Sequence, residues 1–175
     1  ADLEYFHDQV KVTKGFVVYC GDRETATNLI YAHGGKNVVG GRQTVGNNQC
    51  ARVGNHGVAI AGLGGIAQAG DYGKATVGSR GVALVGRNGK AEVGYFGMAK
   101  AGDYAVAKAG DYGTAIAGDY GVVSAGYKGR AMAGEAGWVK VGGYGTAEVG
   151  KGGTVEAGLG SEIRIYYQTH DKTRL

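Results

Sequence analysis

The sequence predicts an all-β protein, a two-sheet β-solenoid with about seven sixteen-residue coils. Two observations lead to this fold class. From Val45 to Arg164 the chain repeats an eight-residue unit, (A/V)-G-x-x-G-x-(A/V)-x, without an insertion or a deletion. Within each unit small and variable residues alternate, which is the period-two pattern of a β-strand. A fixed short period of this kind is typical of solenoids.

Each unit joins a turn to a short strand. The G-x-x-G part, often Gly-Asp-Tyr-Gly, supplies residues that tolerate positive φ and tight reversals. A helix is excluded, because two glycines per unit would cost about 2 kcal/mol relative to alanine. One unit is too short to enclose a core, but two units make a coil with two strands and two turns. The fourteen complete units from Val45 to Glu156 therefore predict seven coils.

The small residues of the strands are predicted to fill a thin core. Because alternate residues of a strand share a face, positions one and seven of each unit point inward. The residues we expect to point inward include Ala67, Ala83, Ala99, Ala115, Val77, Val85 and Val93. Alanine and valine bury little apolar area, so hydrogen-bonded ladders and stacked turns must carry more of the stability than usual.

The flanks are predicted to be caps, because a bare solenoid end is an open sheet edge. We divide the chain into an N-terminal cap (1–44), the octad solenoid (45–160) and a C-terminal capping strand with a tail (161–175). In the first cap, 9–19 is expected to form two short strands around Lys14-Gly15, and 22–32 a short helix. In the last segment, the alternation of Ile163, Ile165 and Tyr167 predicts a longer final strand.

The repeats also resemble known proteins. AGDYGTAIAGDYGVVS and AGYKGRAMAGEAGWVK resemble the sixteen-residue coils of bacterial ice-nucleation proteins, and also glycine-rich octad proteins of phage and prophage genomes. The likeness covers about 45–164 and implies the solenoid fold. The ice-nucleation coils carry a Thr-x-Thr ladder; here the matching positions hold pairs such as Lys90 with Glu92 and Val106 with Lys108.

Composition and motifs predict no enzyme and no cofactor. The net charge of +4 is scattered, so a nucleic-acid partner is not expected. No stretch has the length of a membrane span. Two cysteines are too few for a disulfide framework, which favours reduced thiols and a cytoplasmic location in a bacterium or phage-infected host, with an extracellular assembly left open. The four histidines are dispersed, and no catalytic or metal site is predicted.

Aspartates recur at position three as Asp71, Asp103, Asp111 and Asp119. One carboxylate per turn is few for calcium, which takes six to eight oxygen ligands. We expect each aspartate to stabilise its own turn instead.

Aromatic residues recur at position four and are predicted to stack along the turns. They are Tyr72, Phe96, Tyr104, Tyr112, Tyr120 and Tyr144. Units sixteen residues apart stack, which places Tyr104 over Tyr120, Phe96 over Tyr112, and Lys128 in the second column, where a cation–π contact can form. The ladder either seals the turns or forms a strip for a ligand or partner.

Alternate units are expected to lie on opposite faces. The unit that contains Ile66, and the units that lie multiples of sixteen residues from it, share one outward face. We call this the odd-unit face. Its apolar stripe consists of Ile66, Val82, Leu84, Met98, Ile116 and Met132. Contiguous exposed apolar side chains mark interfaces. The sequence therefore predicts a binding surface for a protein partner or for a second copy in a twofold dimer, unless the N-terminal segment covers it.

Three classes of function stay open on the sequence. The favoured one is a non-enzymatic interaction protein, such as a phage-borne binding or host-antagonist factor. The alternatives are an ice-binding protein, and a structural or adhesin segment of a larger assembly.

Overall fold

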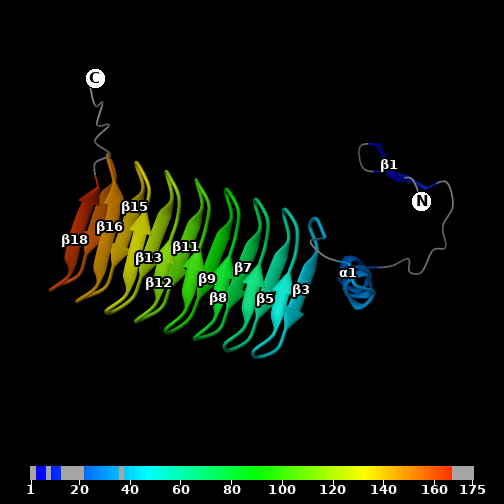
Figure 1. The fold of residues 1–175 in the computed structure, drawn as a ribbon, viewed down its shortest axis with the longest axis horizontal. Helices are drawn as coiled ribbons and strands as arrows, with labels where there is room; N and C mark the ends of the chain where they lie inside the picture. The colour runs from blue at the N-terminus through cyan, green and yellow to red at the C-terminus, as the bar shows by residue number, and fades with distance from the viewer. Residues whose placement is uncertain (1–2, 7–8, 13–21, 36–37, 167–175) are drawn as a thin grey trace, which may run out of the picture.

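The computed structural model describes residues 3–6, 9–12, 22–35 and 38–166, and it is dominated by a β-solenoid (Figure 1). Two parallel sheets of eight strands each form its faces, and sixteen residues separate neighbouring strands of a sheet. The predicted two-sheet solenoid is confirmed. The described sheets make eight coils rather than seven, because strands also form just before and just after the complete units.

The two sheets take alternate strands along the chain. The odd-unit sheet contains β4 (Cys50–Arg52), β6 (Ile66–Gln68), β8 (Val82–Leu84), β10 (Met98–Lys100), β12 (Thr114–Ile116), β14 (Arg130–Ala133), β16 (Thr146–Gly150) and β18 (Glu162–Tyr166). The even-unit sheet contains β3 (Arg42–Val45), β5 (Val58–Ala61), β7 (Lys74–Val77), β9 (Lys90–Val93), β11 (Val106–Ala109), β13 (Val122–Ala125), β15 (Trp138–Val141) and β17 (Thr154–Ala157).

The core between the sheets is built from small side chains, as predicted. Ala67, Ala83, Ala99 and Ala115 are fully buried, and Val77 and Val93 are buried as well. Val85 is half-buried and packs against the same cluster. Because the inward side chains are this short, added volume in one coil has no space to enter.

The G-x-x-G part supplies the positive φ as expected, although the residue that adopts it is neither of the two repeat glycines. The left-handed residue is position four, where Tyr104 and Tyr112 both have φ 55°. The glycines have a steric role instead. A Cβ on Gly118 would overlap Asp103 Oδ1 of the preceding coil, and a Cβ on Gly121 would lie 2.5 Å from that of Ala117. Close stacking of coils therefore favours glycine at position two, and crowding within the unit favours it at position five, where Ala105 is also accommodated.

The N-terminal flank contains the predicted helix. Helix α1 (Arg23–Ala32) begins at Asp22, whose Oδ1 accepts a hydrogen bond of 2.8 Å from Thr25 N, and its C-cap is His33. An oxygen acceptor at the N-cap satisfies an amide that the helix leaves unpaired. The helix contacts β3, and Tyr31 packs against the core cluster. The described helix is too short to span a membrane.

Of the two short strands expected within 9–19, the first is present and the second lies outside the described residues. Strand β2 (Gln9–Val12) pairs antiparallel with β1 (Leu3–Phe6), which precedes it. The expected turn at Lys14-Gly15 lies outside the described residues, as does Tyr167 at the other end of the chain.

Candidate binding surfaces

The apolar stripe of the odd-unit face is formed by two columns of side chains in register. In the first column Ile66 lies beside Val82 and Val82 beside Met98. In the second column Leu84, Lys100, Ile116 and Met132 follow one another across four strands. Ile66 is 40% exposed and Met98 43%, and the other four members of the stripe are half-buried. All six predicted residues therefore share one outer face.

Among the described residues, no element lies over this face. Helix α1 contacts β3 of the opposite sheet, and β1 and β2 contact each other. Figure 1 shows α1 beyond one end of the solenoid, next to β3. The described part of the N-terminal segment therefore leaves the stripe exposed.

At its C-terminal end the odd-unit face changes from apolar to ionic. The side chain of Glu148 is 3% exposed, and its Oε1 accepts a hydrogen bond of 2.6 Å from Arg130 Nη2. Tyr166 donates its hydroxyl hydrogen to Glu148 Oε2 at 3.1 Å, and Arg164 Nη1 lies 3.7 Å from Oε1. A buried carboxylate is tolerated when it is paired and hydrogen-bonded in this way. The sequence analysis missed this cluster, although Glu148 and Arg164 are one coil apart.

Aromatic rings stack along both edges of the solenoid, at the turns. The rings of Tyr104 and Tyr120 are 4.9 Å apart and nearly parallel, and those of Phe96 and Tyr112 are 5.0 Å apart. Both stacks were expected from the sixteen-residue spacing. Tyr72 stacks on His56 at 5.1 Å. His56 also occupies position four, but it was not among the residues predicted to stack.

Two tyrosines at position three extend one of these ladders, and the sequence analysis missed both. Tyr95 packs edge-on against Tyr112 at 5.4 Å, and Tyr127 lies between Tyr112 and Tyr144 at 5.9 and 5.8 Å. Comparing positions three and four together at sixteen-residue intervals would have found them. The expected cation–π contact also forms, because Lys128 Nζ lies 6.0 Å from the ring centre of Tyr112 and 5.4 Å from that of Tyr127.

The position-three aspartates do not act on their own turns as expected. Asp71 Oδ1 accepts a hydrogen bond of 2.8 Å from Arg87 N, and Asp119 Oδ1 accepts one of 2.8 Å from Glu135 N. The donor in each case lies sixteen residues on, in the next coil. Asp103 and Asp111 make the same contact with the coil that follows them. The carboxylates therefore join coils along the turn edges.

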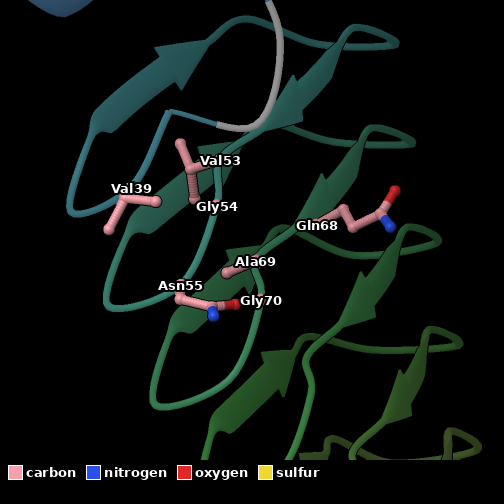
Figure 2. Close-up of a pocket in the computed structure, with 7 residues that line it drawn as sticks. All are labelled: Val39, Val53, Gly54, Asn55, Gln68, Ala69 and Gly70. Carbon is pink, nitrogen blue, oxygen red and sulfur yellow. The ribbon is translucent and has the colours of Figure 1, made fainter. Parts of the chain in front are cut away.

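One hollow of about 350 Å³ lies beside the first turns and is drawn in Figure 2. Its lining residues are Val39, Val53, Gly54, Asn55, Gln68, Ala69 and Gly70, and none has an ionisable or nucleophilic side chain. No three His, Cys, Asp or Glu side chains gather as metal ligands in the part of the chain that the structure describes.

In comparisons with known proteins, no family model, no curated protein and no solved structure matches the chain.

Proposed function

We propose that this chain is a non-enzymatic interaction protein whose solenoid holds the odd-unit face ready for a protein partner. The observation that supports this most directly is the stripe of six apolar side chains on a regular outer face. Its most exposed members, Ile66 and Met98, lie two strands apart in one column. Apolar patches that are contiguous and open to solvent mark interaction sites on soluble proteins.

The solenoid also keeps the stripe in a fixed arrangement. Neighbouring coils are joined through strand ladders and through turn amides, such as Tyr104 N, which donates to Asp119 O at 2.9 Å. A surface that is ordered before binding loses little conformational entropy when a partner docks. This is an advantage for a binding protein with an otherwise small apolar patch.

Charges beside the stripe indicate the partner's chemistry. Lys100 interrupts the second apolar column, and Arg130 lies next to Met132 on β14. We expect a partner with an apolar centre and acidic groups around it, because opposite potentials across an interface favour specific docking. A second copy of the chain is the alternative occupant of this face. The resemblance to phage and prophage octad proteins makes a bacterial host protein the first choice.

A double substitution tests the proposal. Leu84→Asp with Ile116→Asp places two carboxylates in the stripe, and Ile60→Asp with Val122→Asp makes the same change on the outer face of the even-unit sheet. The stripe variant should lose the protein captured from a bacterial lysate by the wild type, and the control should keep it. Both variants should melt near the wild-type temperature. Equal capture by the two variants would contradict the proposal.

Sedimentation of the purified proteins separates the two occupants. If the wild type and the control variant are dimers and the stripe variant is a monomer, the partner on this face is a second copy. If wild type shows no such dimer and captures a lysate protein through the stripe, the partner is a different protein.

A further inference from the structure

The two ends of the solenoid differ in the elements that contact their last strands. At the first end α1 contacts β3, and Gln43 Oε1 of β3 accepts a hydrogen bond of 2.6 Å from Arg52 N. At the last end, β18 pairs with β16 on one side and with no described strand on the other. In the described part of the chain, α1 thus lies against one strand of the first end, whereas no described strand or helix follows β17 and β18 at the last end.

The open edge has the apolar side chains of a core strand. Ile163 continues the inward column of Ala147, and Ile165 continues that of Val149. Ala147 and Val149 are fully buried, whereas Ile163 and Ile165 are 51% and 50% exposed. These two isoleucines therefore close the core on one side and meet solvent on the other, where every earlier coil has a successor.

The backbone of β18 is also placed for pairing. Glu162 N donates to Gly145 O, next to β16, at 2.9 Å. Because hydrogen-bonding directions alternate along a strand, the amide and carbonyl of Ile163 face the open edge. Natural edge strands are usually protected from pairing by shortness, bends, proline or charged side chains, and of these β18 has only the charges of Glu162 and Arg164. This five-residue strand contains no proline and its side chains alternate regularly.

Charge selects a second copy of β18 as the occupant of this edge. Glu162 and Arg164 flank Ile163, and within one chain Arg164 Nε lies 2.8 Å from Glu162 Oε1. Antiparallel pairing centred on Ile163 sets Glu162 opposite the second copy's Arg164, and the converse pair follows by symmetry. Opposite charges in facing positions stabilise a strand pair, and like charges destabilise it. Pairing centred on Arg164 would instead oppose two arginines.

We propose that two copies of this chain join end to end through β18, in a twofold antiparallel pair centred on Ile163. A twofold contact of this type uses the same strand from both copies and closes after two. The joined sheets continue from one copy into the other, and both odd-unit faces stay open. The inference is independent of the partner proposed for that face. The interface is about one coil in cross-section, smaller than standard interfaces of ~1,200–2,000 Å², so the dimer should dissociate on dilution.

Sedimentation velocity of the full chain over a range of concentrations tests this end-to-end dimer. Wild type should shift from monomer to dimer as its concentration rises. Glu162→Arg should be monomeric at the same concentrations, because it places arginines opposite each other. Glu135→Arg makes the same charge change on an exposed turn away from β18 and should dimerise as wild type does. Ile163→Lys should also be monomeric while keeping the wild-type circular dichroism spectrum.

Mixing two variants provides a positive test. Arg164→Glu alone opposes two pairs of carboxylates and should be monomeric, but mixed with Glu162→Arg it restores opposite charges across the junction. The mixture should form a heterodimer that neither variant forms with itself. A wild type that is monomeric at every concentration would overturn the proposal, as would end capping by the chain's own last residues. Dimers that survive Glu162→Arg but not Leu84→Asp with Ile116→Asp would place the contact on the odd-unit face instead.

Discussion

Ala136 and Gly152 occupy position four in neighbouring coils and offer a direct measurement of backbone strain. Both residues are in the left-handed region, with φ 51° at Ala136 and 74° at Gly152. Ala136 is exposed, and a Cβ added at Gly152 would meet nothing within 4 Å. Exchanging alanine and glycine at these positions therefore changes backbone preference with little change in packing.

The expected magnitude follows from two opposing effects. The left-handed region costs an L-residue about 1–2 kcal/mol. Glycine removes that cost. It also gives the unfolded chain more conformational freedom, which lowers the stability of the folded protein by about 0.4–1 kcal/mol. We therefore expect Ala136→Gly to stabilise the protein by about 0.5–1 kcal/mol and Gly152→Ala to destabilise it by a similar amount. For a chain of this length the melting temperature should change by about 1–4 °C.

Urea unfolding of the two single variants and the double variant measures these free energies. The midpoints should move in opposite directions with an unchanged denaturant slope, since the surface exposed on unfolding is nearly the same. The double variant should return close to wild type. A lower midpoint for Ala136→Gly, or an unchanged one for Gly152→Ala, would show that strain at position four does not limit stability.

Three further predictions concern the core, the turns and the pH dependence. Ala99→Leu should lower the free energy of unfolding by roughly 1–3 kcal/mol, because the fully buried site has no space for a larger side chain; a wild-type melting curve would contradict this. Asp119→Ala should cost about 0.5–1.5 kcal/mol through loss of its hydrogen bond from the next coil, whereas Asp119→Asn should retain most of the stability. A side-chain hydrogen bond from Lys90 lowers the pKa of Glu92, with further lowering by the charges of Lys90 and Lys74, against an opposing effect of burial. Ionised Glu92 therefore stabilises the folded protein at pH values above the ordinary glutamate pKa. This contribution is lost as the pH falls through the lowered pKa of Glu92. Melting temperatures measured across that acid range should therefore fall less in Lys90→Met than in wild type.

The repeat predicts the fold because one short pattern specifies strand, turn and spacing together. It predicts about seven coils where the described sheets make eight, since one added strand precedes the complete units, with Gln43 at its inward position, and the other, β18, follows them. That glutamine still fits the first coil because its Oε1 satisfies the backbone amide of Arg52. The reason for this departure from the repeat is a hydrogen bond to the next strand, which the sequence pattern alone does not reveal.

The role of the turn residues is harder to predict from the sequence. Glycine both permits positive φ and leaves room for a close neighbour, and a sequence pattern alone does not separate these two roles. Here the room is used at Gly118, beside the carboxylate of Asp103 from the previous coil. The aspartate was expected to act locally because that is its usual role in isolated turns. Stacking of coils supplies a better-placed donor sixteen residues away.

Strain at position four also helps to separate structural aromatic residues from those available for binding. Tyr104, Tyr112 and Tyr120 are all held at φ 55°, where glycine would be favoured by about 1 kcal/mol or more. Ring stacking returns about 0.5–1.5 kcal/mol for each aromatic pair, which is similar in size to the strain. The stability of the turns is therefore sufficient to account for the aromatic ladder, and its use as a strip for a ligand or partner stays a prediction. The apolar stripe has no comparable explanation, because Ile66 and Met98 point away from the core and no described element covers them. This contrast is the reason to seek the partner at the odd-unit face and not along the aromatic edges.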